Sequence, residues 1–210
     1  MLPGPKYIFK CTNCDNLVSK ESIISGNTFR AKNYSDGKTF APMFRKFPKI
    51  TKCKKCNTIF WLNESALVAT LDYFRERDEK WSKAEGAEFL TVYEYFSALE
   101  LQIAKTNEQE FYLRREIWWG FNDRARFGEE LFTAANDETL WKENSLRLIE
   151  LTDAVEDEEK IMLADLNRSL GNFDNCLTLI NSIEDSEFDW IKESFYRECD
   201  KKNKMVFPLN

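Results

Sequence analysis

Two CxxC pairs constrain this chain more than any other feature of its sequence. Cys11 and Cys14 lie in the run KCTNCDN, and Cys53 and Cys56 lie in the run KCKKCNT. Two thiolate pairs on short turns can complete a tetrahedron around one Zn²⁺, which makes two such pairs a more specific pattern than one. We therefore predict a Cys₄ zinc site formed by Cys11, Cys14, Cys53 and Cys56.

The predicted role of this zinc is structural. A catalytic zinc usually keeps a water molecule in its fourth position, and four thiolates leave no such position. The chain also contains no histidine, which removes the commonest general base and the triads that depend on it. Four unrelated thiols and redox exchange through a CxxC are the alternatives, and the presence of two pairs favours a closed metal site.

The remaining cysteines and the N-terminus indicate the compartment. The run MLPGPKYIFK has no signal-peptide pattern, and no apolar run approaches the roughly 18 residues of a membrane span. We expect a cytoplasmic protein with no membrane association and no disulfides, in which Cys176 and Cys199 are buried thiols on helices.

The sequence predicts two domains. Over residues 1–62, short strands flank both CxxC pairs, as in a zinc ribbon, with an unusually long loop of 38 residues between the pairs. Over residues 63–210, apolar residues recur every three and four positions, which predicts helices over 64–80, 84–105, 107–127, 137–152, 157–170, 173–184 and 187–203. Their short connections predict antiparallel neighbours. The predicted fold is a small β zinc ribbon followed by an all-α domain of antiparallel helical hairpins.

One predicted hairpin, in IMLADLNRSLGNFDNCLTLINSI, resembles a tetratricopeptide repeat. Ala164 and Cys176 are small residues that let paired helices approach, and Gly171 followed by Phe173 ends the first helix as in that repeat. Ile183 departs from the pattern, because a small residue is usual there. The resemblance implies an all-α domain built from tetratricopeptide-like hairpins.

A wider resemblance covers most of the chain. The runs SGNTFRAKNYSDGKTFAPMF, KCKKCNTIFWLNES and YLRREIWWGFNDRARF are similar to a group of uncharacterised bacterial proteins that join a zinc ribbon to tetratricopeptide-like helices. This resemblance implies the architecture and a bacterial source. It implies no activity.

Charge is divided unevenly along the chain. The net charge is −6, but residues 1–62 contribute +9 and the remainder contributes −15. Seven Lys and Arg and no acid lie between Lys38 and Asn63, interleaved with aromatic residues, a composition typical of surfaces that contact phosphates and stack bases. Nucleic-acid binding through Lys52, Lys54 and Lys55 is therefore one hypothesis. Docking of these lysines against the acidic helical domain is the alternative that we favour.

A second candidate binding surface lies in the run RREIWWGFNDRAR. Arg115, Trp118, Asn122 and Arg126 share one face of a predicted helix and can grip a peptide or an anion. The alternative, which we favour, is that the tryptophan fills the core while the polar residues link neighbouring elements.

Taken together, these features predict a non-enzymatic protein whose helical surface binds a protein or peptide partner. Nucleic-acid binding by the ribbon is the alternative, and an enzyme with a site between ribbon and helices, near Arg115 and Trp118, is a third hypothesis. Apart from the zinc ligands, the sequence indicates no catalytic or cofactor-binding residue, and it does not indicate the oligomeric state.

Overall fold

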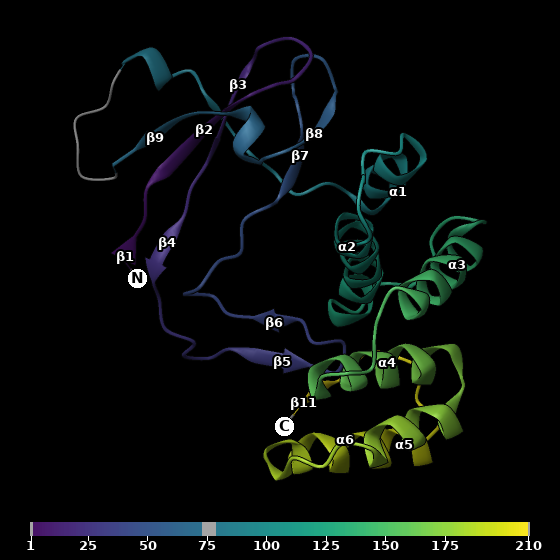
Figure 1. Cartoon of the computed structure of the whole chain (residues 1–210). Helices are drawn as coiled ribbons and strands as arrows, with labels where there is room; N and C mark the ends of the chain where they lie inside the picture. Colours follow the sequence, from purple (N-terminus) through teal and green to yellow (C-terminus); the bar gives the residue numbers. More distant parts are fainter. Residues whose placement is uncertain (1, 73–78, 210) are drawn as a thin grey trace. The chain divides into compact units, whose positions relative to one another are not determined.

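The computed structural model describes residues 2–72 and 79–209 of the chain (Figure 1). Contacts within the chain divide it into two compact units. The first, here called the cysteine unit, comprises Met1–Ala31 and Ala41–Glu94, and the second, the helical unit, comprises Lys32–Phe40 and Tyr95–Asn210. The predicted boundary after residue 62 lies inside the cysteine unit, and the middle of the predicted ribbon loop belongs to the helical unit.

A four-stranded sheet organises the cysteine unit. Its order is β10-β3-β2-β9, in which β2 runs antiparallel to both of its neighbours and β10 runs parallel to β3. Two further antiparallel pairs, β1 with β4 and β7 with β8, lie among the described residues of this unit. The bounds are β1 Leu2–Pro3, β2 Lys6–Lys10, β3 Leu17–Lys20, β4 Ile23–Ser25, β7 Ile50–Lys52, β8 Ile59–Trp61, β9 Leu67–Leu71 and β10 Glu85–Gly86.

The central strand β2 is buried on both of its faces. Ile8 and Phe9 are consecutive, so their side chains point to opposite faces of the sheet, and both are buried. Phe9 packs with Val18 of β3 and Phe60 of β8 in one apolar cluster that also includes Cys11 and Cys53. The first cysteines of both CxxC pairs therefore belong to the core of the unit.

The prediction of a helix over residues 64–80 is wrong for the first half of that range. Glu64–Ala66 forms one 3₁₀ turn, and Leu67–Leu71 is the strand β9, which pairs antiparallel with β2. A run of five residues that includes Val68 and Thr70 suits a strand once a partner with free hydrogen-bonding groups lies beside it. The predicted positions 73–78 fall outside the described residues.

The other predicted helices agree more closely with the structure. They are α1 Val92–Glu100, α2 Asn107–Arg126, α3 Asp137–Glu150, α4 Asp157–Leu170, α5 Phe173–Asn181 and α6 Asp189–Asp200. Only α1 is much shorter than predicted (84–105), because β10 occupies the start of that range and Gln102 leaves the helix with a positive φ of 53°. None of the helices within residues 2–72 and 79–209 has the length and hydropathy needed to cross a bilayer.

Capping residues fix the ends of several helices. The Thr106 side chain accepts a hydrogen bond from the Gln109 backbone N–H at the start of α2. Gly171 ends α4 with a φ of 90°, a left-handed conformation that favours glycine, and α5 begins two residues later. Helices α4 and α5 thus follow each other across a short turn, and their apolar residues pack in one cluster. Between helices α2 and α3, hydrogen bonds from Arg147 and Arg114 hold the pKa of Glu110 below its ordinary value.

A small sheet in the helical unit pairs short strands of the inter-cysteine loop with the C-terminal end of the chain, a pairing that the sequence does not predict. Its strands are β5 Lys32–Tyr34, β6 Thr39–Phe40 and β11 Pro208–Leu209, with β5 in the middle and both pairings antiparallel. We call Lys32–Phe40 the strap, because this segment of the inter-cysteine loop packs with the C-terminal end of the chain. The Ser35 backbone N–H donates to the carbonyl oxygen of Phe207 at 2.9 Å.

Two apolar clusters stand out among the described core residues of the helical unit. Trp118, Trp119, Leu148 and Leu166 join α2, α3 and α4. The second cluster joins α4, α5, α6 and Phe207, and it contains Cys176 and Cys199, whose sulfur atoms lie 3.5 Å apart. Burial raises the pKa of both thiols. These two cysteines are buried thiols on helices, as predicted.

Candidate metal centre

The two CxxC turns have the same backbone structure. In the first, the Cys11 N–H donates to the carbonyl of Asn16 at 2.8 Å, and the Asp15 N–H donates back to the carbonyl of Cys11 at 3.2 Å. In the second, Cys53 and Asn57 occupy the equivalent positions and make the equivalent bonds at 2.9 and 2.8 Å. Each turn closes an antiparallel strand pair, β2 with β3 and β7 with β8.

One residue in each turn adopts the left-handed conformation that the turn requires. Asp15 has a φ of 61° and Asn57 a φ of 60°, and each directly follows the second cysteine of its pair. Aspartate and asparagine tolerate this conformation better than other residues with a side chain. The sequence therefore encodes both turns with the residue types that they need.

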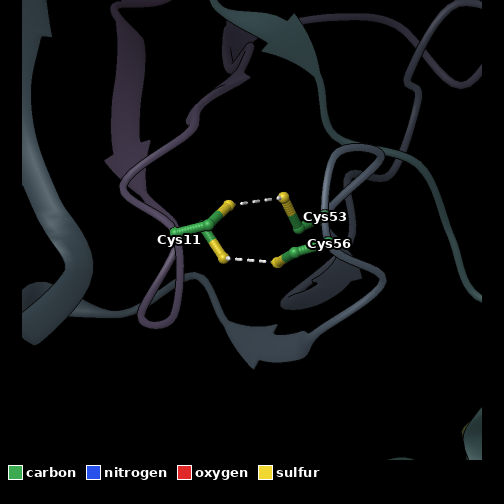
Figure 2. Close-up of side chains that lie close together, drawn as sticks. Cys11, Cys53 and Cys56 are labelled. Atoms are coloured by element: carbon green, nitrogen blue, oxygen red, sulfur yellow. Dashed lines mark hydrogen bonds between the residues drawn. The ribbon is translucent and has the colours of Figure 1, made fainter.

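The turns bring four sulfur atoms together, and Figure 2 shows Cys11 facing Cys53 and Cys56 across the gap between them. All four Sγ atoms lie within 4.8 Å of one another. Cys11 Sγ lies 3.6 Å from Cys56 Sγ, and Cys14 Sγ lies 3.7 Å from Cys53 Sγ. A tetrahedral ion with metal–sulfur bonds of about 2.3 Å has sulfur–sulfur edges of about 3.8 Å, so two of the separations already match such an ion.

The surroundings of the thiols shift the pKa values of Cys14 and Cys56 in opposite directions. The Asn16 backbone N–H favours the Cys14 thiolate, but the thiol of Cys56 and partial burial outweigh this effect and raise the pKa of Cys14 to about 12. Hydrogen bonding to the Thr58 side chain, 3.2 Å away, and to its backbone lowers the pKa of Cys56 to about 5. A cation would be needed to hold all four sulfurs as thiolates at neutral pH.

This cluster meets the requirements of a closed metal site. Cys11 and Cys53 are buried in the core cluster of the cysteine unit, and Cys14 and Cys56 are partly buried at its edge. Four soft sulfur donors in tetrahedral proximity suit a zinc ion and leave no coordination position for a substrate. The four predicted ligands are thus brought together as a candidate metal site.

The lysines near the second turn are partly engaged by acids of their own unit. Lys52 Nζ forms an ion pair with Glu94, and this pairing, opposed by partial burial, lowers the pKa of Glu94. Lys54 Nζ lies 2.5 Å from a carboxylate oxygen of Glu88, a hydrogen bond that raises the pKa of Lys54. Lys55 is exposed. Two of the three lysines proposed to contact nucleic acid therefore have carboxylate partners.

The proposed binding face on α2 is covered by the chain itself. Trp118 is fully buried, Asn122 and Arg126 are almost fully buried, and only Arg115 is partly exposed, where its guanidinium lies 4.5 Å from the ring centroid of Trp119. Trp118, Asn122 and Arg126 are therefore enclosed within the helical unit, and the use of this face by an external partner stays a prediction.

The strap contacts Asn122 and Arg126 of this face through Asp36, while Trp118 packs with Leu148 of α3 and Leu166 of α4. Asn122 Nδ2 donates to Asp36 Oδ2 at 2.8 Å, and the Arg126 guanidinium donates to the same oxygen. The Trp119 indole N–H donates to the Asp36 backbone carbonyl at 2.9 Å. The carboxylate and the backbone carbonyl that these side chains bind therefore belong to the chain itself.

A second buried ion pair lies close to the first. Arg168 of α4 is fully buried, donates to Asp165 Oδ1 at 2.6 Å and donates to the backbone carbonyl of Met205 at 3.0 Å. Burial raises the pKa of Asp36, and the charge of Asp165 adds to this rise while Arg126 opposes it. The sequence analysis missed Asp165 and Arg168. The signal was present, since both charges fall at positions that the apolar period assigns to the core of α4.

Comparison of the chain with protein-family models, with curated proteins and with solved structures finds no match. What the structure establishes is a four-cysteine cluster in a β-rich region, followed by helices.

Proposed function

We propose that this chain is a non-enzymatic interaction protein, in which a structural zinc ion holds the cysteine unit and the helical unit binds a protein or peptide partner. The observation that carries the proposal is an open groove of about 770 Å³ in the helical unit. Its volume falls in the range in which folded proteins hold small ligands or anchoring side chains.

The groove lies where α5 begins and α6 ends. Its apolar lining comes from Phe173 and Leu177 of α5 and from Tyr196 of α6, whose hydroxyl donates to Asn181 Oδ1 at 2.6 Å. The polar lining includes Asn172, Asp174, Asn175, Asp200 and Lys202. A peptide that inserts one apolar side chain and makes hydrogen bonds at the rim fits this lining, because buried aromatic contacts with a polar border are typical of protein interfaces.

The proposed zinc ion supports folding. Four thiolates more than neutralise the cation, leaving the site with a net charge of about −2, and they hold the two CxxC turns together and leave no open position for catalysis. The groove is open and carries no histidine, since the chain has none, and this also favours binding over acid–base chemistry. A tetratricopeptide-like relation of the α4–α5 hairpin, with its small residues at Ala164 and Cys176, is consistent with a peptide-binding helical surface.

Site-specific photo-crosslinking tests the groove. A photoreactive amino acid at Leu177 should capture one defined protein from the native source, and Tyr196→Ala should reduce that capture about tenfold, as expected for an aromatic anchor. Trp190→Ala is the matched control, because Trp190 lies on the same helix with similar exposure but does not line the groove. Equal loss with both substitutions, or no captured protein, would contradict the proposal.

A further inference from the structure

A surface of the cysteine unit combines exposed aromatic rings with cations. It is formed by two segments of the inter-cysteine loop, 26–31 and 41–46, which we call the aromatic loop surface. The segments touch, since a Cβ atom placed on Gly26 would lie 2.7 Å from both the ring of Phe44 and the carbonyl oxygen of Met43. Glycine at this position lets the aromatic ring lie directly on the backbone.

The apolar side chains of this surface face solvent. Phe29 is 71 % exposed, and Met43 and Phe44 are each 44 % exposed. Single exposed apolar residues are ordinary on protein surfaces, but several on adjoining segments of one loop indicate a contact surface.

Within the sequence of the two segments, cations accompany the rings and acids are absent. The two segments, 26–31 and 41–46, contain Arg30 and Arg45 and no Asp or Glu, and the nearest acids in the chain are Glu21 and Asp36. The Arg30 guanidinium lies 5.5 Å from the ring centroid of Phe29, and Arg45 is exposed beside Phe44 in the sequence.

We infer that the aromatic loop surface binds single-stranded nucleic acid. Unpaired bases stack on exposed aromatic rings and on guanidinium planes, while the phosphates require cations without competing carboxylates. Duplex nucleic acid would satisfy the cations and leave the rings in water, and an acidic peptide would not need rings at these positions. This surface is formed by residues other than the lysines of the second CxxC turn, two of which are paired with acids, and it does not depend on the proposed peptide groove.

The test is fluorescence anisotropy with the full-length chain and labelled oligo(dT) and oligo(rU) of about 20 nucleotides. Saturable binding is expected at about 50 mM salt. If three phosphates are contacted, the affinity should fall about 20-fold between about 50 and 200 mM salt. For single strands, the logarithm of the binding constant falls by about 0.7 per contacted phosphate for each tenfold rise in salt concentration. No binding at about 100 μM protein in low salt would overturn the inference.

Matched variants identify the surface. Phe29→Ala and Phe44→Ala should each weaken binding about tenfold through lost stacking, whereas Phe127→Ala, which removes a ring that is also 71 % exposed but lies in the helical unit, should not. Equal effects of Phe29→Ala and Phe127→Ala would overturn the inference.

A charge variant keeps the test independent of the rings. Arg45→Glu should weaken binding and reduce the salt dependence of the affinity. Lys142→Glu makes the same charge change at an exposed position of α3 and should do neither. Binding of polyglutamate with the same sensitivity to Phe29→Ala would assign the surface to an acidic protein and overturn the proposal. Unchanged zinc content and thermal midpoint show that each variant is folded.

Discussion

Replacing Asp36 by asparagine should destabilise the helical unit, although Asp36 lies in the loop between the two CxxC pairs. The substitution keeps the shape of the side chain and removes the negative charge that Arg126 contacts. Arginine stays charged inside proteins, so Asp36→Asn leaves a guanidinium that is almost fully buried with less compensation. Its Nε already has no hydrogen-bond partner within the described residues.

The magnitude follows from what Arg126 retains. Breaking a buried ion pair on one side typically costs about 3–5 kcal/mol. Arg126 keeps an ion pair with Asp123 at 2.5 Å and contact with the ring of Tyr34, but the Asp123 side chain is one-third exposed and its field is partly screened. We therefore expect Asp36→Asn to lower the free energy of unfolding by about 3 kcal/mol, the lower end of that range. For an m-value of about 2 kcal/mol/M, this corresponds to a urea midpoint about 1.5 M lower.

Urea unfolding followed by circular dichroism at 222 nm measures this loss, since α2 to α6 belong to the helical unit. Glu150→Gln is the matched control, because it removes an exposed carboxylate from the same unit and should leave the midpoint unchanged. Arg126→Met should cost less than Asp36→Asn, since burial raises the pKa of Asp36 and the carboxyl group can take up a proton. The double variant should lose less than the sum of the two. A loss below about 1 kcal/mol for Asp36→Asn, or additive effects, would refute the reasoning.

Three further predictions concern the metal site, an ion pair and a turn. Purified protein should contain one zinc per chain, and Cys53→Ser should abolish zinc binding and unfold the cysteine unit, whereas Cys176→Ser should leave the zinc content unchanged in elemental analysis. Glu110→Gln should lower the thermal midpoint at pH 7. Because folding lowers the pKa of Glu110, the carboxylate stabilises the fold above its unfolded pKa of about 4.3, and this stabilisation is lost as the pH falls further. Thermal scans below about pH 4 should therefore show the midpoints of the two proteins converging. Gly171→Ala should lower the free energy of unfolding in urea by at least about 1 kcal/mol, because φ is 90° and the new Cβ would lie 2.8 Å from Lys204 Nζ. Gly86→Ala is the control and should be neutral, since no atom lies within 4 Å of its Cβ position.

The candidate metal site could be predicted because its information is local. Each CxxC pair needs only a turn of a few residues, and the aspartate or asparagine that follows each pair suits the left-handed conformation at Asp15 and Asn57. The start of α2 and the end of α4 were likewise predictable, since Thr106 and Gly171 are adjacent to the backbone groups that they satisfy.

The features that the sequence analysis missed depend on residues far apart in the chain. Leu67–Leu71 is a strand because β2, some sixty positions earlier, offers it hydrogen-bonding groups. The strap is ordered by β11 and by α2, and nothing in its own polar, glycine-containing sequence indicates either partner. The spacing of Trp118, Asn122 and Arg126 correctly indicated a shared face, but periodicity does not tell whether solvent, a partner or the same chain covers it.

The strap also determines how the chain can be divided without losing its structure. A cut after residue 62, where composition and charge change, would leave Asp36 on one fragment and its site, Asn122 and Arg126, on the other. The second fragment would contain the helices of the helical unit but would expose the indole N–H of Trp119 and the guanidinium of Arg126, which the strap otherwise contacts. The two fragments would then be complementary to each other, in the manner of a peptide and its receptor. The loop that makes the spacing between the CxxC pairs so long is therefore a covalently attached ligand of the helices.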